Sequence, residues 1–139
     1  MSFELLRYST RFTVPFNLVN TATVAATITA TVGPDGTANT YVPNFYKLYG
    51  RRFTASTSSS TPVTLTITDS SINAPVYQAV VGSSGYAEEE REITQPLFIV
   101  NGGGQMIFTS VLPAGSAVSG LVTYTCLLYT STLPTKRIV

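Results

Sequence analysis

Apolar and polar residues alternate with a period of two in two stretches of this chain. From residue 22 to residue 32, alternate positions are Ala, Val or Ile, and the positions between them are Thr with one exception. The segment 62–70, PVTLTITDS, repeats the pattern, with Val63, Leu65 and Ile67 separated by threonines. Successive side chains of a strand point to opposite faces, so this period predicts strands with one buried face. The β-branched threonines suit the exposed face of a pleated sheet.

Further apolar runs of strand length follow one another along the chain. They are residues 6–14, 45–55, 76–81, 96–100, 105–112 and 118–129. Turn-forming sequences such as GPDG, NGGG and LPAG separate them, and no stretch has the sustained spacing of an amphipathic helix. We therefore predict an all-β chain, a single-domain antiparallel β-sandwich over residues 1–139. About eight strands favour a jelly-roll-like arrangement.

The composition adds an expectation about partners. Charged residues make up 11% of the chain, against roughly 25% in an average soluble domain. Monomeric proteins guard the free edges of their sheets with charge, above all with Lys, and this chain has only Lys47 and Lys136. Little charge is left to keep its surface apart from neighbours. We therefore expect self-association, with a trimer favoured.

Residues suited to catalysis or metal binding are scarce. The chain has no histidine and one cysteine, Cys126, which we expect to be a small buried hydrophobic residue. The NGGGQ segment lacks the Lys and Ser/Thr of a phosphate loop and reads as a hairpin turn. The serines beside glycine have no histidine partner. We expect no enzyme, no catalytic residues, no metal and no cofactor.

Two further partners are not expected. A net charge of +1 is too small for nucleic-acid binding, whose affinity comes largely from accumulated basic charge. No apolar run approaches the roughly 18 residues that span a bilayer, and the start, MSFELLRYSTRF, lacks an uninterrupted apolar run. We expect neither a membrane anchor nor a signal peptide.

An acidic run stands out against this low charge. Glu88, Glu89, Glu90 and Glu92 lie within the segment YAEEEREITQPLF, with Arg91 among them. On an extended chain every second carboxylate shares a face, about 6.8 Å from the next, so the row must lie in water or meet positive charge. A solvated rim, arginines of a neighbouring subunit, a calcium site and a glycosidase carboxylate pair are the alternatives.

Our hypothesis is that these carboxylates meet basic groups across a subunit boundary. The candidates within the sequence are Arg51 and Arg52 of a neighbouring copy. Opposite charges repeated around a closed ring would steer docking and set its register.

A second group of residues interleaves aromatic and basic side chains. In NFYKLYGRRFTAS, residues 44–56, Phe and Tyr alternate with Lys and Arg on one parity. A strand whose aromatics join the core or an interface, with basic stems crossing apolar neighbours, explains this pattern. Base stacking and sugar stacking on Tyr41, Tyr46 or Tyr49 are the alternatives.

Two segments carry a resemblance to a known class. EITQPLFIVNGGGQMIFTSVLPAGSAVSGLVTYTCLLY resembles the closing half of small jelly-roll structural proteins of viruses, particularly head decoration or cement proteins of tailed phages. The earlier PVTLTITDSSINAPVYQAVVG is similar to their middle strands. The resemblance implies a non-catalytic virion protein made in the host cytoplasm. It implies attachment to the major capsid protein on the capsid exterior, commonly as a trimer. The rival function is a carbohydrate-binding or receptor-binding module of a tail or fibre.

Overall fold

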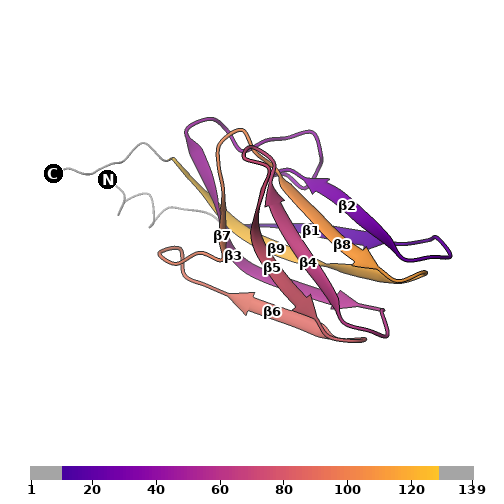
Figure 1. Cartoon of the computed structure of the whole chain (residues 1–139). Coiled ribbons are helices and arrows are strands. Elements are labelled where there is room, and N and C mark those ends of the chain that lie inside the picture. Colours follow the sequence, from indigo (N-terminus) through magenta and orange to yellow (C-terminus); the bar gives the residue numbers. More distant parts are fainter. Residues whose placement is uncertain (1–10, 129–139) are drawn as a thin grey trace.

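The structure is a computed structural model that describes residues 11–128. Within that range it contains nine strands and no helix, so it offers no helix that could cross a membrane. The strands are β1 (Arg11–Val19), β2 (Ala26–Val32), β3 (Tyr46–Thr57), β4 (Val63–Asp69), β5 (Ala74–Val81), β6 (Tyr86–Glu90), β7 (Phe98–Val100), β8 (Met106–Leu112) and β9 (Ala117–Leu128). They form two sheets that face each other (Figure 1).

The strand order is that of a jelly roll. One sheet has the order β1-β9-β3-β6, with β7 also on β3, and the other has the order β2-β8-β4-β5. All the strand pairs are antiparallel. Strands from the two ends of the chain lie side by side in both sheets, as expected when two Greek keys are wound together. The predicted all-β sandwich of jelly-roll type is confirmed.

Two strands differ in extent from the prediction. The strand expected from residue 22 begins only at Ala26, because the buried Asn20 holds the preceding loop with donors to the carbonyls of Val24 and Leu112 and an acceptor for the amide of Ala22. β1 runs on to Val19, well past the predicted end. It passes through Pro15, which an edge strand tolerates since one side of its backbone needs no partner. Residues 6–10 of that prediction lie outside the described range.

The acidic run forms a strand that the apolar pattern did not predict. β6 pairs antiparallel with β3, so that Glu90 lies opposite Arg52 and Glu88 opposite Thr54. β7 pairs with the first part of the same strand, opposite Leu48. β6 and β7 therefore share one side of β3 and act as one edge strand interrupted by a loop.

The core lies between the two sheets and is dominated by aromatic rings. Phe16 of β1 stacks on Phe108 of β8 with centroids 4.5 Å apart, and on Phe53 of β3 at 5.8 Å. Tyr77 of β5 packs against Phe53 at 5.3 Å and against Phe98 of β7 at 5.7 Å. Since these rings come from both sheets, their contacts fix the distance between the layers.

We expect Phe108→Ala to destabilise the protein by about 3–5 kcal/mol, because the side chain is fully buried and its loss leaves a cavity. At about 2–4 °C per kcal/mol, the melting temperature should fall by roughly 10 °C. Val111→Ala on the same strand is the control, since that side chain is 62% exposed and should change stability by less than about 0.5 kcal/mol. Equal losses in the two variants would contradict this account of the core.

Candidate assembly surfaces

The outward carboxylates of β6 meet arginines of their own chain. Arg52 Nε donates to Glu88 Oε2 at 3.0 Å, and its Nη2 donates to the same oxygen. Arg11 Nη1 lies 3.4 Å from Glu90 Oε2. Both pairs lie on the outer face of the five-stranded sheet and are about half exposed, so each adds little stability. The hydrogen bonds that Arg52 donates to Glu88 raise the pKa of Arg52.

The remaining carboxylate of β6 points the other way and joins the two sheets. Tyr77 Oη on β5 donates to Glu89 Oε1 at 2.7 Å, and Arg91 Nη2 donates to Glu89 Oε2 at 3.1 Å. β5 and β6 belong to different sheets, so this bond crosses the side of the sandwich where they lie. Burial raises the pKa of Tyr77, and the hydrogen bond to Glu89 adds to the shift.

Arg51, the other arginine named as a candidate partner of the carboxylates, is buried. It sits where the register of β3 shifts between Gly50 and Arg52, and it is only 7% exposed. Its Nε donates to the carbonyl of Arg91 at 3.1 Å and its Nη1 to Thr125 Oγ1 at 3.3 Å. Burial lowers its pKa, and the nearby Arg11 lowers it further. Arg51 thus ties the loop after β6 to the sheet.

The hypothesis of a charged subunit boundary stays a prediction. Of its residues, the structure brings Arg52 and Glu88 together within one chain, while Arg51 lies beneath the surface. Glu92 is exposed in the loop after β6, where its carbonyl accepts the amide of Gln95. A neighbouring copy could reach these groups only where their side chains remain partly exposed.

The predicted stacking tyrosines divide between two places. Tyr41 and Tyr46 are exposed near the start of β3, and Tyr49 is half-buried on that strand, opposite Ile99 and Thr125. Phe45 belongs to the aromatic and basic group of residues 44–56 but was not among the stacking candidates, and it lies between Tyr41 and Tyr46 in the chain. It is 74% exposed and has a φ of 71°, a backbone conformation that is strained for an aromatic residue.

The loop of residues 101–104 supports this strained turn. The amide of Gly103 donates to the carbonyl of Val42, and the amide of Val42 donates to Gly104. A Cβ on Gly102 would lie 2.9 Å from the carbonyl oxygen of Pro43, so only glycine allows this close approach. The NGGG segment therefore packs against the turn that exposes Phe45, besides joining β7 to β8.

The outer face of the four-stranded sheet carries no charge. We call it the threonine face, and its outward side chains are Thr27, Thr29 and Thr31 of β2, Ile107, Thr109 and Val111 of β8, Thr64, Thr66 and Thr68 of β4, and Gln78 and Val80 of β5. Thr29 and Thr109 hydroxyls lie 3.5 Å apart, and Gln78 donates to Thr66 at 3.2 Å. Neutral threonines thus meet across neighbouring strands.

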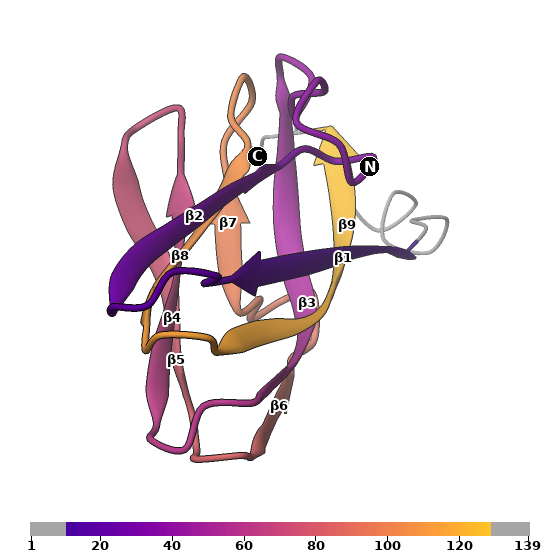
Figure 2. The same cartoon turned by 90° about the vertical axis from the view of Figure 1, so that its right-hand side faces the viewer.

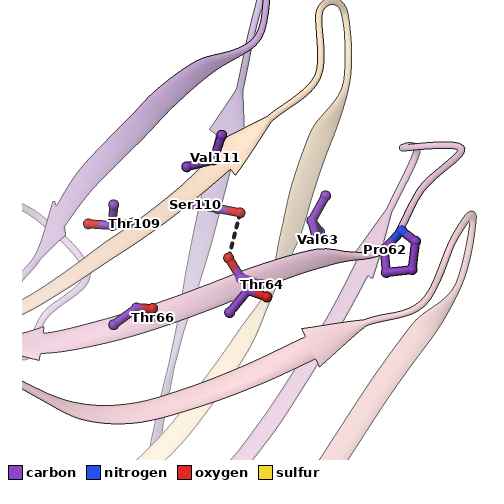
Figure 3. Close-up of a pocket in the computed structure, with 7 residues that line it drawn as sticks. All are labelled: Pro62, Val63, Thr64, Thr66, Thr109, Ser110 and Val111. Atoms are coloured by element: carbon purple, nitrogen blue, oxygen red, sulfur yellow. Dashed lines mark hydrogen bonds between the residues drawn. The ribbon is translucent and has the colours of Figure 1, made fainter.

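A shallow depression of about 440 Å³ lies on this face. Figure 3 shows its lining between β4 and β8, where the hydroxyl of Ser110 donates to the carbonyl of Thr64 at 2.8 Å. A second depression of about 410 Å³ lies beside Tyr77, Glu88 and Glu89. Within residues 11–128 no group of three or more His, Cys, Asp or Glu could hold a metal ion.

The remaining candidate residue, Cys126, is half-buried beside the core. Burial raises the pKa of its thiol to about 11. The thiol therefore stays protonated at neutral pH. The deprotonated thiolate is the reactive form of a cysteine.

Distant solved structures include both viral and carbohydrate-binding proteins. A carbohydrate-binding module CBM36, in complex with calcium and xylotriose, is 7% identical over 76% of this chain and 77% of its own, with a TM-score of 0.39. A chain of the virus-like particle of extra small virus from the giant freshwater prawn Macrobrachium rosenbergii is 17% identical over 85% of this chain and 79% of its own, with a TM-score of 0.36. A chain of infectious bursal disease virus, Gx strain, is 14% identical over 90% of this chain and 34% of its own, with a TM-score of 0.32. No protein-family model and no curated protein matches the chain. Likenesses at this distance assign no function.

Two features of these surfaces went unnoticed in the sequence, for different reasons. The alternating threonines indicated an exposed face, and the absence of charge between residues 62 and 82 apart from Asp69 could have shown that this face is neutral. The bond between Tyr77 and Glu89 depends on two strands from different sheets meeting at one side. The pattern of residues within one segment cannot predict a side-chain contact between strands of different sheets.

We expect stability to fall as the pH rises above about 10. Tyrosines of an unfolded chain ionise near pH 10, whereas burial raises the pKa of Tyr77 and raises the pKa of Tyr124 to about 12. In that interval the unfolded state has lost protons that the folded state keeps, so the contribution of the tyrosines is complete below pH 10 and declines above it. The thiol of Cys126, whose pKa burial raises to about 11, adds a decline that begins near pH 9, where an unfolded thiol ionises. Melting temperatures measured from pH 8 to 11 should show this decline.

Tyr77→Phe should flatten the alkaline decline, since one buried phenol is removed. Glu89→Gln is the companion variant and should flatten it less, because burial, the larger cause of the shift in the pKa of Tyr77, remains. A Tyr77→Phe slope equal to that of the parent would contradict the assignment.

Proposed function

We propose that the chain is a non-catalytic structural subunit of a virus particle, which docks onto neighbouring shell proteins through the threonine face. The observation that carries the proposal is that charged side chains lie on the outer face of one sheet and are missing from the outer face of the other. The outward ion pairs Arg52–Glu88 and Arg11–Glu90 lie on the five-stranded sheet, while the four-stranded sheet presents only neutral side chains. The sequence resemblance to viral jelly-roll proteins supports the choice of a virion.

A neutral face suits repeated protein contacts. Docking there strips water from hydroxyl and methyl groups and from no ion, so the desolvation cost of unpaired charges does not arise. Four strands about 4.8 Å apart and about seven residues long cover roughly 400–450 Å², below the roughly 800 Å² per partner of a stable interface. One such contact is weak, and many identical contacts in a shell strengthen one another.

The narrower expectations remain parts of this proposal. They are a decoration or cement protein, a position on the capsid exterior, the major capsid protein as partner, synthesis in the host cytoplasm and a homotrimer. None of the three solved structures described above is a tailed-phage decoration protein by its printed name.

One observation favours a second candidate, the carbohydrate-binding or receptor-binding module. Tyr41, Phe45 and Tyr46 expose aromatic surface at one end of the sandwich, and Phe45 does so from a strained backbone conformation. Strain of this kind gathers at sites of function. Glycan-array binding that Phe45→Ala abolishes would support this candidate.

The proposed function is tested by counting copies of the chain in particles purified on a density gradient. We expect the parent at tens of copies or more per particle. Thr66→Lys, which adds a charge at the centre of the threonine face, should reduce the copies at least tenfold while the purified variant folds normally. Asn17→Lys, on the exposed side of β1, is the control and should be incorporated like the parent.

The parent and the Thr66→Lys variant test different parts of the proposal. Absence of the parent from purified particles would overturn the virion function. Full incorporation of Thr66→Lys would instead show that the subunit docks through another surface.

A further inference from the structure

Each sheet ends in outer strands whose free backbone groups can pair with a strand of another chain. Within the part of the chain that the structure describes, these outer strands are β1 and β6 with β7 in one sheet, and β2 and β5 in the other. Natural proteins guard such edges with charge, proline, bulges or short length. The outer strands of this chain differ in which of these four features they have.

Most of the outer strands carry a guard. β1 contains Pro15 and begins with Arg11, and β5 contains Pro75 beside the register shift at Thr68. β6 carries its glutamates, and β7 is only three residues long. These edges resist the addition of another strand.

β2 has none of these guards. Its sequence, ATITATV, contains no charge and no proline, and its pairing with β8 runs in unbroken register from Ala26 to Val32. β-branched residues fill most of it, which favours extended pairing. In Figure 2, β2 and β1 are the near strands and their directions diverge, and the two strands contact each other without pairing.

The core beneath β2 is also incompletely covered. The inward side chains Ala26, Ile28 and Ala30 are only half-buried. The corresponding inward residues of the other near strand, including Phe16 and Leu18 of β1, are buried. Another strand beside β2 would cover this apolar flank.

The sequence of β2 is complementary to itself in the antiparallel direction. If two copies pair about Thr29, then Thr27 of each lies opposite Thr31 of the other, and Thr29 lies opposite Thr29. The inward pairs are Ile28 with Ala30 and Ala26 with Val32, so every outward pair is Thr with Thr and every inward pair is apolar. Such pairs stabilise neighbouring strands, and a contact that meets its own copy is the kind a two-fold axis produces.

We propose that β2 pairs with β2 of a second copy of this chain, antiparallel, about a two-fold axis at Thr29. The two four-stranded sheets then become one continuous sheet, and the two threonine faces become one. The contact deepens the proposed function and rests on it for its biological role, but it is tested on the purified protein alone. It joins chains in pairs and does not itself close a trimer.

Cysteine cross-linking tests the axis directly. Opposed residues of antiparallel strands have Cα atoms about 4.5–5.5 Å apart, which a disulfide can bridge. In a Cys126→Ala background, Thr29→Cys should therefore form a covalent dimer under mild oxidation. Thr27→Cys is the matched control on the same strand and face, since the two copies of residue 27 lie about 13 Å apart. It should stay monomeric on a denaturing gel, and Thr27→Cys combined with Thr31→Cys should cross-link.

A charge exchange tests the same contact without cysteine. Thr29→Lys and Thr29→Glu should each lose the two-fold dimer that the parent forms at tens of micromolar by native mass spectrometry, because like charges meet at the axis. Mixing the two variants should restore a heterodimer. Thr66 lies on β4, two strands away from β2. Thr66→Lys should therefore remain dimeric, although under the proposed function this variant is poorly incorporated into particles.

The proposal is overturned if the parent is monomeric at these concentrations and Thr29→Cys forms no cross-link. It is equally overturned if Thr29→Lys remains dimeric, since another surface then joins the copies. Loss of the chain from purified particles with intact Thr29 cross-linking would refute the virion function alone.

Discussion

A continuous chain of aromatic contacts holds the two sheets together, and the outer faces keep their orientation through it. Phe108 of the four-stranded sheet stacks on Phe16, and Phe16 stacks on Phe53. Phe53 then contacts Tyr77 of the four-stranded sheet, and Tyr77 contacts Phe98, both with tilted rings. The chain thus passes from one layer to the other and back. At Tyr77 the ring packs in this interior while the hydroxyl donates to Glu89, so one residue joins the apolar interior to the charged side of the sandwich.

The clustering of acidic residues has an explanation within the fold. β6 is an outer strand, and charge on an outer strand discourages pairing with another chain. Its outward glutamates also have arginine partners, Arg52 and Arg11, that are distant in sequence, and its inward one joins two sheets. A chain with few charges therefore places several of them where they guard an edge and bridge the layers.

Local pattern predicted the fold class, because alternation in segments such as 63–67 directly reflects which side chains face the core. It did not predict β6, since glutamates do not mark a buried face and the strand is specified by its pairing with β3. It also started β2 too early, because alternation cannot report that Asn20 holds the chain in a loop before Ala26. For the surfaces, the acidic run was expected to meet arginines of a neighbouring copy, and the folded chain shows in addition that Glu88 and Arg52 meet within one molecule. The burial of Arg51 could not be predicted, because it lies where the pairing of β3 with β9 shifts register, and no local pattern marks that position.

The division between a charged sheet and a neutral sheet also separates two kinetic quantities. Charges act at a distance and change how fast partners meet, whereas close contact at a docked surface determines how long they stay together. In this molecule the outward ion pairs lie on the five-stranded sheet and the neutral threonine face lies on the other. Under the proposed docking, substitutions on the five-stranded sheet would alter the rate of encounter, and substitutions on the threonine face would alter the lifetime of the complex.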